Sequence, residues 1–247
     1  MIVKYLALVF FIISTANAAV TDKQFSADAI ISIPGKAQTS SRIYVGKNVI
    51  RTEIQTQNGL IVDIVYPLEG KLIKLNPRLK QYFEIPIEKY KNDLQINENP
   101  CYRLKNTTCT KLKEENINGL ITQKWKIVAL EKGKSIKTLH WIDIQRQLAI
   151  KEIFSDGSRV DMILKKNEII NNRKVEKWVR TLSRSDGLVI NSFQWYDPQL
   201  KMAIREELPG GYVRELMNIK IGVQENILFE IPKNYSAFEA DLYPNKS

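Results

Sequence analysis

The feature that most constrains the fold is a regular alternation of short β-rich runs with turn signals, which begins near Phe25 and continues through most of the chain. The breaks between early runs include Asn58-Gly59, Glu69-Gly70 and Asn76-Pro77. Asn-Gly between apolar runs is a strong hairpin signal. This spacing leaves no room for crossover helices, so successive strands are expected to pair antiparallel, mostly as a meander. Only two segments, roughly 88–94 and 224–229, are typical of helical or irregular structure.

The second half of the chain contains an internal duplication. Residues 117–125, INGLITQKW, align with residues 170–178, INNRKVEKW, at an offset of 53 residues. After one inserted residue the match continues at an offset of 54, where Trp141-Ile142-Asp143 aligns with Trp195-Tyr196-Asp197. The copies, about 117–169 and 170–222, each read as one four-stranded meander of about fifty residues.

The number of strands bears on the overall architecture. A sheet of roughly twelve strands or more does not stay flat, because strand twist accumulates until the sheet curls or closes. Apolar residues alternate with lysines and arginines in the duplicated strands, so each strand has one apolar side. The sequence therefore predicts a mainly β protein with one large antiparallel sheet, folded as a single domain over residues 19–247.

The first residues have the pattern of a secretory signal peptide. Lys4 precedes an apolar run over residues 5–13, and Ala16-Asn17-Ala18 is a small-x-small cleavage pattern. The alternative is an uncleaved anchor, but the run is well short of the roughly 20 residues that span a bilayer. We expect residues 1–18 to be the signal peptide, cleavage after Ala18, and a periplasmic mature protein.

Export changes the interpretation of the two cysteines and of the net charge. An oxidising compartment favours a disulfide between Cys101 and Cys109, with a catalytic thiol as the lesser alternative. A metal site is disfavoured because the only histidine, His140, is distant in sequence. The formal charge of +10 is spread over dispersed lysines and arginines, which indicates a solvated outer face or contact with an anionic membrane surface, and no nucleic acid.

The stretch FSADAIISIPGKAQTSSRIYVGKNVIRTEI, followed by KLIKLNPRLKQYFEI, is similar to the opening of the outer-membrane lipoprotein-sorting proteins LolA and LolB. The later order NPC, CTKL, INGLITQKW, WID, GGYVRELMNIKIG and ILFEIPKNY resembles a little-characterised exported branch of that group. The resemblance implies a strongly curved sheet that forms an incomplete barrel, short helices that cover its concave side, and an apolar cavity between them. In the carriers that cavity holds acyl chains of a lipoprotein.

Motifs of the common enzyme classes are absent from the sequence. There is no G-x-S-x-G, S-x-x-K, H-E-x-x-H or phosphate-binding glycine loop, and Ser-His-Asp chemistry would have to use His140. We therefore predict no catalytic residues, no cofactor and a non-enzymatic protein. Glu152 and Glu206 have the same parity as apolar neighbours, so each either enters a cavity or lies at a strand end open to water.

The leading hypothesis is a periplasmic binding protein, a carrier or sensor, for an apolar ligand such as the acyl chain of a lipid or lipoprotein. The main alternative is an envelope interaction or scaffold module with a packed interior that holds a protein partner. The four tryptophans either line a cavity or fill the interior of each meander. The candidate cavity residues are Trp125, Trp141, Trp178, Trp195, Ile150, Ile204 and Met202.

Overall fold

The computed structural model describes residues 23–89, 100–101, 106–131 and 133–238. The expected signal peptide, residues 1–18, and most of the segment 88–94 lie outside the described residues. None of the helical structure in the described ranges is long and apolar enough to cross a membrane.

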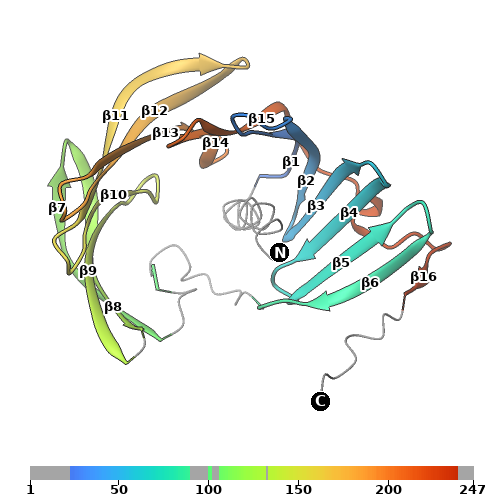
Figure 1. Cartoon of the computed structure of the whole chain (residues 1–247), viewed down its shortest axis with the longest axis horizontal. Coiled ribbons are helices and arrows are strands. Elements are labelled where there is room, and N and C mark those ends of the chain that lie inside the picture. Colours follow the sequence, from blue (N-terminus) through green and yellow to red (C-terminus); the bar gives the residue numbers. More distant parts are fainter. Residues whose placement is uncertain (1–22, 90–99, 102–105, 132, 239–247) are drawn as a thin grey trace. The chain divides into compact units, whose positions relative to one another are not determined.

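The described chain is almost entirely β-structure, as the turn spacing predicts (Figure 1). The first strands are β1 (Phe25–Ser32), β2 (Thr39–Gly46), β3 (Val49–Thr56), β4 (Gly59–Tyr66), β5 (Lys71–Asn76) and β6 (Gln81–Pro86). The next are β7 (Thr107–Ile117), β8 (Leu120–Glu131), β9 (Lys134–Asp143), β10 (Ala149–Ile153), β11 (Arg159–Ile170), β12 (Arg173–Ser183), β13 (Val189–Asp197) and β14 (Met202–Leu208). The last elements are β15 (Tyr212–Ile221), the 3₁₀ helix η4 (Asn226–Phe229) and β16 (Ser236–Ala237).

These strands form one sheet of 16 strands in the order β16-β6-β5-β4-β3-β2-β1-β15-β14-β13-β12-β11-β10-β9-β8-β7. Its two ends, β16 and β7, are different strands, so the sheet is not closed into a barrel. The chain divides into two compact units: unit 1 contains Lys36–Lys91 with Glu215–Ser247 and the N-terminal strand, and unit 2 contains Asn92–Arg214 with a short segment, Ile33–Gly35. The single-domain organisation and the strong curvature stay predictions.

The core of unit 1 is one face of strands β3–β5 covered by the C-terminal segment. Phe229 of η4 is buried in a cluster whose other members are Val49, Val62, Ile64, Ile73 and Leu75. Arg51 donates a hydrogen bond to the Leu228 carbonyl at 2.7 Å, and the Tyr66 hydroxyl donates to the Phe229 carbonyl. Beyond the turn, β16 pairs in parallel with the edge strand β6. The C-terminal segment thus seals both a face and an edge of unit 1.

The expected cover of several short helices is not found in the described ranges. The segment 224–229 does contain η4, but this is a single 3₁₀ turn, and Glu88 and Lys89 have no regular structure. The physical reason is visible at η4, where the side chain of Phe229 inserts into the apolar face. A long amphipathic helix is therefore not needed to cover that face.

Unit 2 contains two successive meanders, β7–β10 and β11–β14, each of which begins one strand before the predicted copies 117–169 and 170–222. The two meanders are similar even in their irregularities. Pairing shifts between Lys111 and Glu114 in β7, and between Leu164 and Lys166 in β11. In each meander, the last strand also has one residue that is skipped in its pairing with the preceding strand. This residue is Ile150 in β10 and Ile204 in β14. Such β-bulges re-aim the side chains that flank them. The duplicated sequence therefore folds into two copies with the same bulge positions.

Candidate functional site

The two faces of unit 2 differ in chemistry. Strand pairing aligns Lys124 with Trp141 and Trp141 with Lys151, and it aligns Trp125 with His140 and His140 with Glu152. Since successive side chains alternate across a strand, these two rows lie on opposite faces. The side that carries Trp125, Glu152, Val160, Leu182 and Trp178 is called the apolar face below, and the side that carries Lys124, Trp141, Lys177 and Trp195 is called the cationic face.

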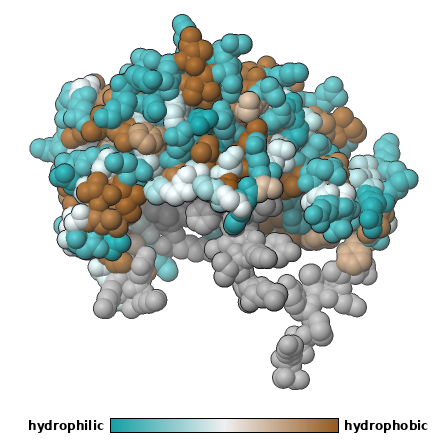
Figure 2. Space-filling view, turned by 45° about the horizontal axis from the view of Figure 1, so that its top comes forward, coloured by the Kyte–Doolittle hydropathy of each residue, from teal (hydrophilic) through white to brown (hydrophobic). Residues whose placement is uncertain are grey.

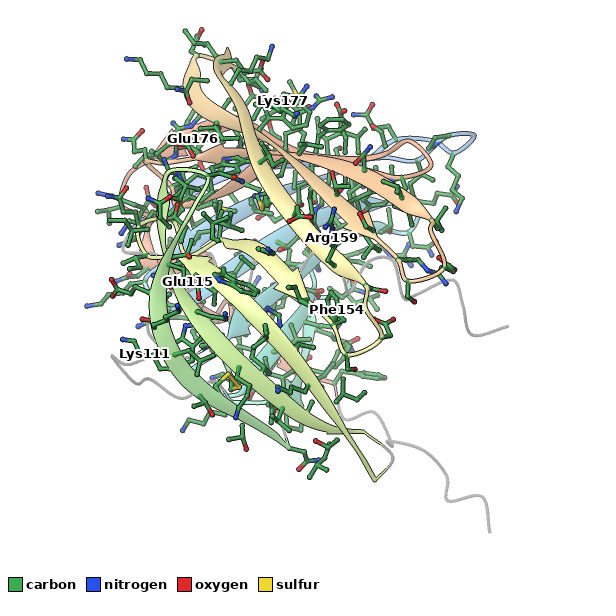
Figure 3. The ribbon with its side chains drawn as sticks, turned by 90° about the vertical axis from the view of Figure 1, so that its left-hand side faces the viewer. Lys111, Glu115, Phe154, Arg159, Glu176 and Lys177 are labelled. Carbon is green, nitrogen blue, oxygen red and sulfur yellow. A yellow bond between two sulfur atoms is a disulfide. The ribbon has the colours of Figure 1, made fainter. Side chains whose placement is uncertain are left out.

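On the cationic face of the first meander, Trp141 is stacked between two lysines. The ammonium groups of Lys124 and Lys151 lie 4.6 and 5.2 Å from the centroid of the indole ring. The indole N–H donates to Glu115 of β7, which Figure 3 labels, at 2.7 Å. The hydrogen bonds from Trp141 and Lys124 lower the pKa of the Glu115 carboxyl below its usual range. The two contacts are compatible, because cations favour the face of the indole ring while the carboxylate accepts a hydrogen bond from the N–H at its edge.

The second meander repeats this arrangement at equivalent positions. Lys177 and Arg205 lie 4.5 and 5.2 Å from the centroid of Trp195, and the Trp195 indole N–H donates to Glu168 (Figure 3 labels Lys177). Hydrogen bonds from Lys166 and from Trp195 lower the pKa of Glu168. Trp141 and Trp195 are each 4% exposed, and the groups that cover their rings are charged, so the surface above both indoles is cationic and not apolar.

The apolar face holds the other two tryptophans. Trp125 packs with Ile127 and with the disulfide of Cys101 and Cys109, whose Cα atoms are 5.6 Å apart. Trp178 is fully buried in a cluster with Ile150, Met162 and Tyr196. The predicted disulfide is therefore confirmed, and it links Cys101 to β7 on the apolar face beside Trp125.

An ion network flanks Trp178. Arg146 donates to Glu176 through two bonds of 2.8 Å and to Asp143 at 2.9 Å, and its guanidinium lies 5.7 Å from the Trp178 ring centroid. The Glu176 and Asp143 carboxylates raise the pKa of Arg146. Burial raises the pKa of the nearby Tyr196 to about 12. The charges of Arg146, Asp143 and Glu176 are paired with one another. This pairing indicates that the network joins the turn after β9 to β12.

The two acids singled out from the sequence lie on the apolar face, and both have basic neighbours. Glu152 is the cross-strand neighbour of His140, and Glu206 forms an ion pair with Arg214. His140 contacts the Thr138 hydroxyl at 2.9 Å through Nε2. A nucleophile–base–acid triad also needs the acid to hydrogen-bond the imidazole, and the structure gives Glu152 and His140 no such bond. The arrangement does not form a catalytic triad.

His140 gives the protein a specific pH dependence, because it is the only histidine of the chain. Burial lowers its pKa from 6.5. At pH values between the lowered pKa of folded His140 and 6.5, the unfolded chain binds a proton that the folded chain does not. The free energy of unfolding therefore falls as the pH drops through this range. Replacing His140 by glutamine, the residue that occupies the equivalent position 194, is expected to remove this loss of stability. Urea unfolding of the unmodified protein and of His140→Gln at pH 7.5 and 5.5 tests this prediction. An equal change in the free energy of unfolding between the two pH values in both proteins would contradict it.

The seven predicted cavity residues do not share one face. Trp125, Trp178 and Ile150 lie on the apolar face, while Trp141 and Trp195 lie on the cationic face. Met202 and Ile204 are buried in β14, where Met202 pairs with Asp197. Sequence reasoning missed the role of Lys124, Lys151, Lys177 and Arg205, which it assigned to a solvated surface. Their recurrence beside tryptophan in both copies was the available signal.

Other apolar surface lies at hairpin ends. Ile121, Ile169 and Val189 are 62, 70 and 58% exposed. On the side shown in Figure 2, hydrophobic residues form separate patches among hydrophilic ones. A pocket of about 330 Å³ beside the β11–β12 hairpin is open to solvent and is lined by Asn167, Glu168, Ile169, Lys174, Val175, Glu176 and Pro198. None of these features joins the two tryptophans of the apolar face.

No protein-family model and no curated protein matches this chain. Among solved structures, a LolA superfamily protein from Nitrosomonas europaea is similar over 90% of this chain and 96% of its own, with 11% identity and a TM-score of 0.37. A protein from Vibrio parahaemolyticus named as a putative outer membrane lipoprotein-sorting protein domain is similar over 83% of this chain and 88% of its own. The identity is 11% and the TM-score is 0.29. MucB, solved in complex with MucA(peri), is similar over 96% of this chain and 64% of its own, with 9% identity and a TM-score of 0.35. The group that the sequence resembles is thus also present among its structural neighbours.

Proposed function

We propose that the protein is a periplasmic, non-enzymatic binding protein whose apolar face in unit 2 receives the acyl chain of a lipid or lipoprotein. The observation that carries this proposal is the separation of the two faces: one side gathers Trp125, Ile127, Val160, Met162 and Trp178, while the other carries the cation-stacked tryptophans. An apolar sheet face requires a second layer to cover it. The described residues of unit 2 supply strands alone for their regular structure, and the clusters around Trp125 and Trp178 are already buried. The ligand is therefore proposed to lie over the exposed rim of this face.

The energetics suit an alkyl chain. Burial of each methylene contributes about 0.8 kcal/mol before ordering costs are subtracted. The rim of the apolar face leaves Leu164 and Leu208 exposed by 37 and 39%, so apolar area remains for a ligand beside the buried tryptophans. The Cys101–Cys109 disulfide fits an oxidising compartment, which agrees with the expected export.

The two pairs of tryptophans allow a matched test. Bromine atoms on an acyl chain quench indole fluorescence only at short range, so brominated fatty acids should quench Trp125 and Trp178 rather than Trp141 and Trp195. We expect the double variant Trp125→Phe/Trp178→Phe to lose most of the quenching and Trp141→Phe/Trp195→Phe to retain it. Phenylalanine keeps most of each ring's packing, and circular dichroism checks the fold.

The result against the proposal is equally specific. Equal quenching in both double variants would place the lipid away from the apolar face. No quenching in the unmodified protein, together with native mass spectra that contain only the bare polypeptide, would favour a scaffold that holds a protein partner.

A further inference from the structure

The arginines that the structure describes in unit 2 pair with a carboxylate, with one exception. The described arginines of this unit that pair with a carboxylate are Arg146 with Asp143 and Glu176, Arg159 with Asp161, Arg173 with Asp197, Arg184 with Asp186, Arg205 with Glu207 and Arg214 with Glu206. Arg180 differs, because its guanidinium makes no hydrogen bond, ion pair or ring contact within the described part of the chain. Arg180 is half-buried as a residue, but no buried side-chain nitrogen of the described residues lacks a hydrogen-bond partner. The unpaired guanidinium of Arg180 therefore reaches solvent, where an anion can approach it.

Arg180 also lies on the apolar face. It follows Trp178 by two residues in β12, so the two side chains share a side of the strand. Its cross-strand neighbours are Met162 of β11, which is 4% exposed, and Ser192 of β13. Met162 and Trp178 belong to the same hydrophobic cluster. The positive charge therefore stands at the border of the packed apolar cluster, where no carboxylate is its register neighbour.

The duplication shows that the fold does not require a cation here. The position equivalent to Arg180 in the first meander is Ile127, at the same offset of 53 that relates Trp125 to Trp178. Ile127 packs with Trp125 and is 7% exposed. Two copies with the same strands and bulges thus differ at this position, one being apolar and the other cationic. An apolar face that carries a positive charge without a carboxylate partner among the described residues matches an amphiphile with an anionic head.

We infer that Arg180 is the anchor for the acidic head, a carboxylate or a phosphate, of a lipid whose hydrocarbon chain lies on the apolar face. The planar guanidinium presents N–H donors in a fork that matches both oxyanions through two parallel hydrogen bonds. This inference rests on the proposed function and adds to it the sign of the ligand's charge and the orientation of its chain.

The test compares acids with neutral analogues of the same chain length. Displacement of a neutral fluorescent probe, N-phenyl-1-naphthylamine, gives affinities for oleic acid against methyl oleate and for phosphatidic acid against diacylglycerol. We expect the unmodified protein to bind at least one acid about tenfold more tightly than its neutral analogue, the size typical of a charge-assisted pair. Arg180→Met should lose that preference while its affinity for the neutral analogue is unchanged, and Arg180→Lys should keep part of it.

The matched control is Arg159→Met, which removes an exposed arginine from the opposite face of the neighbouring strand. It should keep the preference for acids, and all variants should unfold at the same urea concentration. If both lipid classes bind with equal affinity to the unmodified protein and to Arg180→Met, acyl binding stands and the anchor is wrong. Displacement of the probe by acetate or inorganic phosphate alone would show a free-anion site and would also overturn the inference. If no lipid binds at all, the proposed function itself fails.

Discussion

Replacing Phe229 by alanine is expected to destabilise unit 1 by about 3 to 5 kcal/mol, the range for truncating a buried aromatic side chain. The ring is 6% exposed and fills the centre of the cluster on β3–β5. The protein provides space for it at Gly46, where a Cβ atom would lie 2.8 Å from the ring. Loss of the ring therefore removes apolar contact and leaves a cavity that the paired strands cannot collapse to fill.

The same 3₁₀ turn supplies the control. Ile227 lies two residues before Phe229 and is 64% exposed, so Ile227→Ala should change the free energy of unfolding by less than about 0.5 kcal/mol. Urea unfolding followed by far-ultraviolet circular dichroism measures both variants. Equal losses in the two would mean that the turn contributes little and that the strands are stable without it.

Replacing Trp178 by alanine should destabilise unit 2 by a similar amount, about 3 to 5 kcal/mol. The side chain is fully buried between Ile150, Met162 and Tyr196, which lie on three different strands. The variant also removes the ring beneath Arg146, whose two carboxylate partners remain. We expect the larger part of the loss to come from packing, because the ion network stays satisfied.

Two further variants separate these contributions. Trp178→Phe keeps an aromatic ring and should lose clearly less than Trp178→Ala, whereas Ile169→Ala, at a 70% exposed position in the preceding strand, should have little effect. Chemical denaturation with intrinsic fluorescence from the remaining tryptophans reports the unfolding of unit 2. A Trp178→Ala protein as stable as Ile169→Ala would exclude the proposed role of this cluster as the core of the unit.

The candidate site was only partly accessible from the sequence. The sequence predicted the pairing of the cysteines and named Trp125 and Trp178 as candidates for a cavity, because each belongs to a local pattern or to the duplication. Trp141 was grouped with them, although it faces the other way. Alternation shows which residues of one strand share a side, but which sides of two strands coincide depends on their pairing register. The register here includes the skipped residues Ile150 and Ile204, which only the paired strands reveal.

The sequence by itself determined the succession of antiparallel hairpins and the Cys101–Cys109 bridge, since turns, alternation and short-range pairing are local properties of the chain. The tertiary structure alone decided that Phe229 fills a core built from residues 49–75, and that Arg180 is left without a carboxylate among the described residues. Both depend on contacts between segments that are distant in the chain, and no local pattern specifies which groups meet.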